Sequence, residues 1–121
     1  MTQSGLPRLG SVVWASVVDT NGFRKVRSAI VVTATDEITI GKPVRLAAVT
    51  TRVPDPLPQD HVLLPWNPQG TARSGLRRRC AAVVSWLLEI SVDDLVIAGA
   101  LPATVTQEIL AKIGQASGPA P

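Results

Sequence analysis

The sequence predicts a mainly β domain that ends in one α-helix, an α+β fold built on a small, strongly bent sheet or barrel. Short apolar runs follow one another at close spacing, and Gly- and Pro-containing turns separate them. Residues 102–113 instead space their apolar side chains as a helix does. At 121 residues the chain is expected to form one domain with a single modest core.

The first two expected strands form a hairpin. Residues 10–18 carry apolar side chains with a period of two, which fits a strand covered on both faces. Residues 19–22 contain Asn-Gly, which tolerates the positive φ of a tight turn. Residues 29–33 give the second strand, and Arg27 stands at its opening. We therefore expect a guanidinium at one end of the hairpin.

The middle of the chain alternates short strands with loops. A weak run at 38–40 precedes a clear strand at 44–50. Three prolines in residues 53–58 exclude that segment from a sheet, so we expect a loop there. Residues 61–64 form a short strand, and residues 81–90 form two strands or one bent strand.

The C-terminal part is expected to be helical. Ser91 caps a short turn that carries Asp93 and Asp94 where they complement the helix dipole. The helix over 102–113 has a capping box at Thr104 and Gln107 and Gly114 at its end. The expected organisation is a tail at 1–8, a domain at 9–114 and a disordered tail at 115–121.

The charge and composition of the chain favour some classes of protein and exclude others. The net charge is +3 with a pI near 9.8, and most of the basic residues are Arg, which grips phosphate with two hydrogen bonds. Ordinary solvated surface charge is the alternative. No run is long enough to span a membrane and no signal segment begins the chain, so we expect a cytoplasmic protein. The single Cys80 excludes an internal disulfide and a Cys-based zinc site.

Six motifs follow one another over residues 9–113. They are Gly10-Ser-Val-Val-Trp14, Arg27-Ser28-Ala29-Ile30-Val31-Val32, Ala48-Val49-Thr50-Thr51, His61-Val62-Leu63-Leu64, Gly75-Leu76 through Trp86-Leu87, and Gly99-Ala100-Leu101-Pro102. In this order and spacing they resemble the PemK/MazF family of bacterial toxin ribonucleases. The resemblance implies an SH3-like barrel of the MazF/Kid/CcdB type that forms a homodimer.

The resemblance also implies an activity and its residues. Such proteins are toxins of type II toxin–antitoxin systems, and cut single-stranded RNA at short sequences without a metal ion or cofactor. An acidic, partly disordered cognate antitoxin silences them. The functional Arg and Thr of the family fall on Arg27 and Thr50. The residues expected to hold the RNA backbone are Arg24, Lys25, Thr51, Arg52 and Arg78, with Arg77 and Arg79 as weaker candidates.

The chemistry of RNA fits this assignment. The 2′-hydroxyl is a built-in nucleophile, and a fixed guanidinium and a hydroxyl would stabilise the extra charge of the transition state. Because Arg keeps its proton at neutral pH, we expect Arg27 to act electrostatically rather than as a general acid.

The sequence leaves the general base unassigned. In the Kid branch of the family an Asp takes part, but Cys80 stands at that position, and Ser28 replaces the Pro that follows the family Arg. His61 is the single histidine, and its expected role is a half-exposed strand residue. Three acidic loop residues are further candidates, with turn-forming or solvated roles preferred: Asp19, Asp55 and Asp60.

Two other functions stay open. One is a non-catalytic protein on the same fold, either a CcdB-like gyrase poison or an inactive relative that binds an antitoxin. The other is an SH3-like nucleic-acid-binding module without turnover. Trp14 and Trp86 are expected in the core or a subunit interface rather than as base-stacking platforms.

Overall fold

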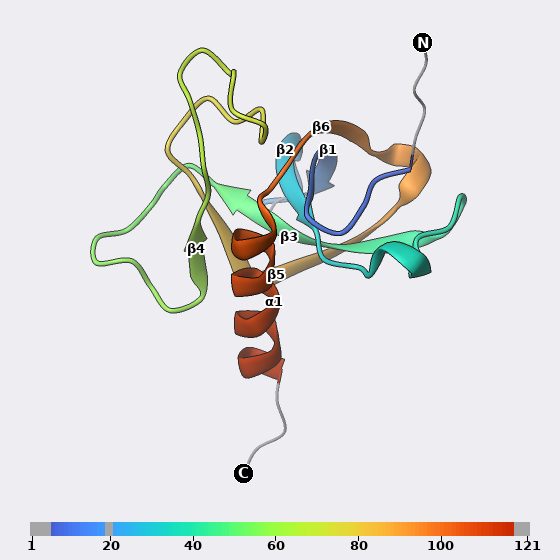
Figure 1. The fold of residues 1–121 in the computed structure, drawn as a ribbon. Coiled ribbons are helices and arrows are strands. Elements are labelled where there is room, and N and C mark those ends of the chain that lie inside the picture. Colours follow the sequence, from blue (N-terminus) through green and yellow to red (C-terminus); the bar gives the residue numbers. More distant parts are fainter. Residues whose placement is uncertain (1–5, 19–20, 118–121) are drawn as a thin grey trace.

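Six strands form one antiparallel sheet in the computed structural model, which describes residues 6–18 and 21–117 (Figure 1). The strands are β1 (Ser11–Val18), β2 (Arg24–Val31), β3 (Pro43–Thr50), β4 (His61–Leu63), β5 (Ala81–Ser91) and β6 (Val96–Ala100). The short helices η1 (Thr35–Glu37) and η2 (Val92–Asp94) and the helix α1 (Ala103–Ser117) complete the fold. The mainly β class with a C-terminal helix is confirmed.

The strand order is β4-β5-β3-β2-β1-β6, and the sheet is not closed. Within the described residues no pairing joins the two end strands, so the expected barrel is an open, bent sheet. The helix α1 lies against β5 and β4 instead (Figure 1). The helix therefore covers β4 and β5. A closed barrel would instead have needed the end strands β4 and β6 to pair.

Two apolar clusters lie on opposite faces of the sheet. The helix-side cluster contains Val12, Ile30, Val49 and Ile109, and α1 covers it. The second cluster, on the opposite face, contains residues that alternate with these along the same strands, such as Val13 beside Val12. The period of two in residues 10–18 thus supplies both cores. Only the first half of β1 is covered on both faces, because Trp14, Ser16 and Val18 are exposed.

Several boundaries differ from the sequence predictions. β2 begins at Arg24, so Arg27 lies inside the strand rather than at its opening. Residues 38–40 form no strand and follow η1 instead. Residues 81–91 form one bent strand, and the exposed edge strand β6 was not predicted.

The helix also differs in detail. It begins at Ala103, so Thr104 lies inside its first turn and does not cap it. It continues through Gly114 to Ser117, and residues 115–117 are helical rather than part of a tail. The predicted capping Ser91 is confirmed, since its Oγ accepts the N–H of Asp93 at 3.4 Å in front of η2. None of the described helices combines the length and apolar character needed to cross a membrane.

Candidate active site on the open face of the sheet

Arg27 and Thr50 lie on neighbouring strands. The last paired residues of β2 and β3 are Ala29 and Ala48. Arg27 and Thr50 each lie two residues beyond this pair. Side chains two positions apart share a face of a sheet, so both project on the face away from α1. The two residues assigned from the family resemblance therefore share one face of two inner strands.

The guanidinium of Arg27 has an unusual environment. Its Cζ lies over the indole ring of Trp86, 5.1 Å from the ring centroid. Its Nε is buried, and within the part of the chain that the structure describes it meets no hydrogen-bond acceptor. Buried polar groups are nearly always hydrogen-bonded, so an unpaired one calls for an explanation. A bound anion would supply the missing acceptor.

The hydroxyl of Thr50 is only partly engaged. Its Oγ1 accepts the backbone N–H of Arg52 at 3.1 Å, which fixes the turn after β3. The hydroxyl can donate to the carbonyl oxygen of Arg52, but at 3.5 Å this contact is long. The hydroxyl proton can therefore turn to a better acceptor without loss of a strong bond.

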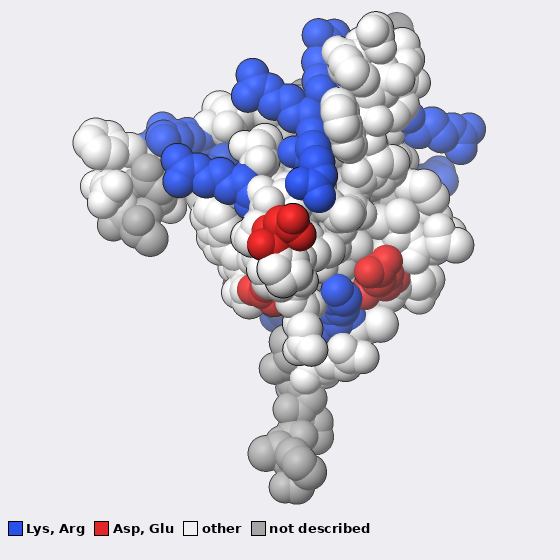
Figure 2. Space-filling model, turned by 90° about the vertical axis from the view of Figure 1, so that its left-hand side faces the viewer, with Lys and Arg blue, Asp and Glu red and all other residues white. Residues whose placement is uncertain are grey.

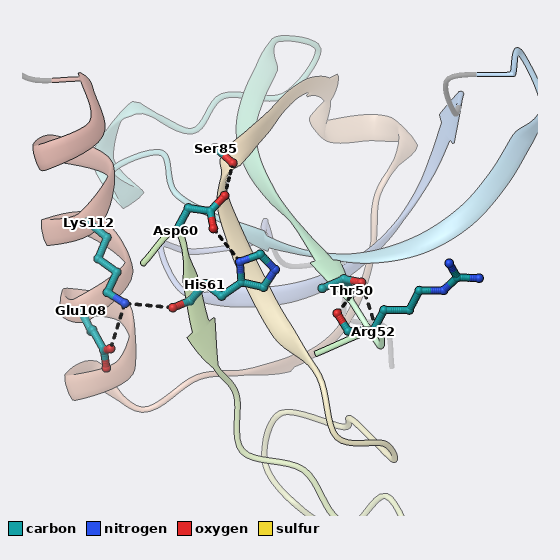
Figure 3. Close-up of polar contacts among 7 residues, drawn as sticks. All are labelled: Thr50, Arg52, Asp60, His61, Ser85, Glu108 and Lys112. Carbon is teal, nitrogen blue, oxygen red and sulfur yellow. Dashed lines mark hydrogen bonds and ion pairs between the residues drawn. The ribbon is translucent and has the colours of Figure 1, made fainter. Parts of the chain in front are cut away.

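A third polar group lies on the same face, two strands away (Figure 3). His61 pairs with Val83, and Val83 pairs with Ala48, so these residues form one row across the sheet. The Nδ1 of His61 lies 2.7 Å from Oδ1 of Asp60, and Asp60 Oδ2 accepts the hydroxyl of Ser85 at 2.6 Å. In Figure 3 the imidazole lies between Asp60 and Thr50.

The contacts of Asp60 define its charge. The hydrogen bond from Ser85 and then that from His61 lower the pKa of the Asp60 carboxyl below its ordinary value. The carboxylate therefore stays ionised and holds the imidazole by Nδ1, which leaves Nε2 for other partners. The backbone of this strand is also fixed, because Lys112 of α1 donates to the carbonyl of His61 at 2.9 Å.

A pocket of about 450 Å³ opens where β2 and β3 part. Its lining includes Arg27, Thr51 and Arg78 together with Trp14 and Cys80, but not Thr50. The pocket thus brings three of the predicted site residues together, but Val49, Leu76 and Cys80 of its lining belong to the helix-side cluster, so it does not open on the face that carries Thr50. Trp14 is 43% exposed there, so within this chain it is a surface residue rather than a core residue.

Basic side chains surround this region. Arg24, Lys25 and Arg52 are exposed and lie outside the pocket lining, and Arg77 lines the pocket. Arg24 donates to Ser16 Oγ at 3.4 Å. Figure 2 shows Lys and Arg gathered over the upper part of one face, with acidic side chains mostly below them. Across residues 6–18 and 21–117 no arginine is in an ion pair, which leaves these cations available to an anion.

Among the described residues, no carboxylate forms an ion pair with Arg27. Cys80 is buried, and burial raises the pKa of its thiol to about 11, so it is a neutral apolar lining group at physiological pH. Asp55 is exposed, and Asp19 lies outside the described residues. In the described part of the chain no three His, Cys, Asp or Glu side chains group as metal ligands would.

The sequence predictions gave no site role to Trp86 or Ser85, and they preferred ordinary structural roles for Asp60 and His61. Trp86 packs against the apolar cluster on this face, as its expected core role requires, and it also contacts Arg27, which was not expected. Ser85 carried no signal in the sequence, because its role depends on a distant Asp. Asp60-His61 are adjacent in the chain, and that adjacency was the available hint.

No protein-family model matches the chain, and no curated protein matches it. Solved structures do resemble it. MazF from Deinococcus radiodurans has a TM-score of 0.75 at 17% identity, over 96% of this chain and 100% of that chain. The Mycobacterium tuberculosis toxin MazF-mt6 has a TM-score of 0.65 at 21% identity, over 88% of this chain and 94% of that chain.

A third similar structure is an endoribonuclease in complex with its cognate antitoxin from a mycobacterial species. Its TM-score is 0.69 at 15% identity, over 95% of this chain and 99% of that chain. At these identities the likeness is one of fold. The resemblance read from the sequence motifs is therefore confirmed as a MazF-type fold.

Proposed function

We propose that the chain is a PemK/MazF-like toxin of a type II toxin–antitoxin system, and that it acts as an endoribonuclease on single-stranded RNA. The proposal includes cleavage of mRNA in the cytoplasm, which would stop translation and growth. The MazF-type fold supports it, as do the similar structures, which include a toxin and an endoribonuclease.

One observation carries the proposal. The buried Nε of Arg27 has no protein acceptor in the described chain, and Thr50 lies on the same face of the neighbouring strand. A guanidinium edge and a hydroxyl on one face form two donors for one phosphate. A purely structural arginine would be expected to pair its buried nitrogen with a carbonyl or a carboxylate.

The reaction needs charge stabilisation on the phosphate. The 2′-oxygen of RNA attacks the adjacent phosphorus, and the bond from phosphorus to the 5′-oxygen of the next nucleotide breaks. A 2′,3′-cyclic phosphate and a 5′-hydroxyl result. Arg27 and Thr50 would donate to the non-bridging oxygens, where charge increases in the transition state. Removal of one such donor typically costs about 10²–10³-fold in rate.

The proton of the 2′-hydroxyl needs an acceptor, and His61 is the best placed group. Asp60 holds its Nδ1, so Nε2 can take the proton. Water returns a proton to the 5′-oxygen that leaves. His61→Asn should therefore slow cleavage.

The proposal also includes an RNA-binding surface and two protein partners. Arg24, Lys25, Thr51, Arg52 and Arg78 would hold the RNA backbone on either side of the cleaved bond. An acidic, partly disordered antitoxin would cover the same cations, and a homodimer would be the active form. These assignments rest on the family resemblance and on the exposed cations.

The test uses the purified chain and a long unstructured RNA in the presence of EDTA. Wild type should cut, and Arg27→Ala and Thr50→Ala should each cut at least about 10²-fold more slowly. Arg45→Ala is the matched control, because Arg45 is an exposed arginine on β3 outside the site. The proposal fails if wild type leaves the RNA intact, or if both site variants cut as fast as the control.

A second candidate function is protein binding without cleavage. The exposed apolar side chains Trp14 and Val26 beside the pocket favour it, since such surfaces often bind proteins. Growth arrest by induced protein that persists in Arg27→Ala would support this alternative. Arrest that disappears in Arg27→Ala would support the nuclease.

A further inference from the structure

The strand β5 carries an irregularity at the centre of the sheet. Ala47 of β3 pairs with Leu87, whereas the next residue, Ala48, pairs with Val83. Three residues of β5, Val84–Trp86, therefore have no partner on β3. This segment is a β-bulge, and bulges near active sites often redirect side chains.

The bulge changes which face the side chains occupy. Ala82 and Val84, the first residue of the bulge, belong to the helix-side cluster. Trp86, the last residue of the bulge, and Leu88 pack against the cluster on the opposite face. An uninterrupted strand would keep all of them on one face. The bulge is thus the reason that Trp86 emerges on the side of Arg27.

The guanidinium of Arg27 packs on the indole ring of Trp86. The Cζ of Arg27 lies over the indole at 5.1 Å, and the Nε is buried and unpaired within the described chain. Aromatic rings hold arginine by cation–π attraction without use of its N–H donors. Trp86 can therefore fix the position of the charge without occupying an N–H donor of the guanidinium.

The other residues of the bulge hold the Asp60-His61 pair. The N–H of Val84 donates to the carbonyl of Asp60 at 2.8 Å. The hydroxyl of Ser85 donates to the carboxylate of Asp60 at 2.6 Å, and that carboxylate holds His61. The segment Val84–Trp86 therefore contacts Arg27 through Trp86. It also contacts Asp60, which holds His61, through Val84 and Ser85.

We propose that the bulge Val84–Trp86 is the positioning element of the site. Trp86 places the guanidinium of Arg27 for the phosphate, while Val84 and Ser85 set Asp60 and, through it, the imidazole of His61. This inference rests on the proposed RNA cleavage for its catalytic consequence, but the contacts themselves can be tested without cleavage. Trp86 is a positioning residue, because it acts through Arg27.

The first experiment compares Trp86→Leu with Trp86→Phe. Leucine keeps the apolar packing but has no π face, and phenylalanine restores one. We expect kcat of Trp86→Leu to fall about 3- to 30-fold, the range of a cation–π contact. KM should change less, and Trp86→Phe should recover most of the loss. Trp66→Leu is the matched control, because Trp66 lies in the loop between β4 and β5.

The second experiment reads the contact directly by NMR. Ring current from Trp86 should shift the Nε–Hε resonance of Arg27 upfield of the other arginines in wild type, with assignment from Arg27→Lys. This measurement needs no variant of Trp86, so it holds even if Trp86→Leu does not fold. An Arg27 resonance in the ordinary range would overturn the inference.

The two proposals fail in different ways. If wild type does not cut RNA, the proposed function fails, and binding of a single-stranded DNA oligonucleotide then tests the inference. That affinity should fall in Trp86→Leu and not in Trp66→Leu. If wild type cuts RNA but Trp86→Leu keeps full kcat and full affinity, the positioning role is wrong and the proposed function stands.

Discussion

The two faces of the sheet differ most where β3 meets β5. On the face under α1, Val49, Ala82 and Val84 pack with Ile109, and all are buried and apolar. On the other face Arg27 and the Asp60-His61 pair depend on single contacts with defined geometry. The first face is held by packed area, which many residues share. The second face has its own apolar cluster, but the polar groups at this end of it are held by individual contacts, so changes to those groups should affect chemistry more than stability.

The largest effect is expected from Ile109→Ala on the helix face. Ile109 is fully buried, and loss of such a side chain typically costs about 2–5 kcal/mol of unfolding free energy. Urea titration followed by circular dichroism would measure the loss. At a temperature where the variant is folded, RNA cleavage should stay near wild type. A loss of kcat in the folded variant would break the distinction between the faces.

A smaller effect, on the rate alone, is expected from Asp60→Asn. The amide keeps the shape but loses the charge that holds Nδ1 of His61. Groups that orient a functional imidazole typically contribute about 10- to 100-fold, so kcat should fall by that factor. Asp36→Asn, on the exposed helix η1, is the control. If both variants cut equally well, His61 has no role in proton transfer.

Ser85→Ala should act through the titration of Asp60. Its hydrogen bond is the main cause of the lowered pKa of Asp60, so that pKa should rise in the variant. A carboxyl whose pKa is lowered in the folded state stabilises the fold at pH values above its ordinary pKa. This stabilisation is lost as the pH falls through the lowered pKa. The difference in unfolding free energy between wild type and Ser85→Ala should therefore be present at pH 5 and shrink in acid. Carbon-detected NMR titration of the carboxyl checks the pKa itself.

The smallest effect is expected at Cys80, on the helix face. Burial raises the pKa of its thiol from 9.0 to about 11, so at neutral pH alkylation by iodoacetamide should be slow. Because the thiol pKa is raised in the folded state, the wild-type free energy of unfolding is unaffected at pH values below the ordinary thiol pKa. It declines as the pH rises toward the pKa of the folded state. Cys80→Ala should lose less stability between pH 9 and 11, and the chain has no tyrosine to obscure this comparison. Rapid alkylation at pH 7 would contradict a buried thiol.

The sequence contained enough to predict the fold because hydrophobic periodicity records burial. The alternation in residues 10–18 and the helical spacing in 102–113 each match an observed element. β6 was missed because its residues are mostly exposed, so no apolar alternation marks it. An edge strand is held mainly by backbone hydrogen bonds to β1, and these leave little trace in side-chain pattern.

The site could be predicted only in part. The Arg and Thr positions came from the resemblance, and the register puts Arg27 and Thr50 on one face. The support by Trp86 and Ser85 could not be predicted, because it depends on a change of face within β5. The bulge consists of Val, Ser and Trp and contains no glycine or proline. The sequence pattern of β5 therefore gives no sign of an interruption.

The contact between Lys112 and the carbonyl of His61 has a consequence for solubility. β4 is an end strand of only three residues, and its outer backbone groups are available to strands of other molecules. Lys112 takes up one of these carbonyls and places a positive charge beside it. The last turns of the helix therefore shield the sheet against edge-to-edge aggregation, and a chain truncated before Lys112 should form β-rich oligomers on storage even where its fold survives.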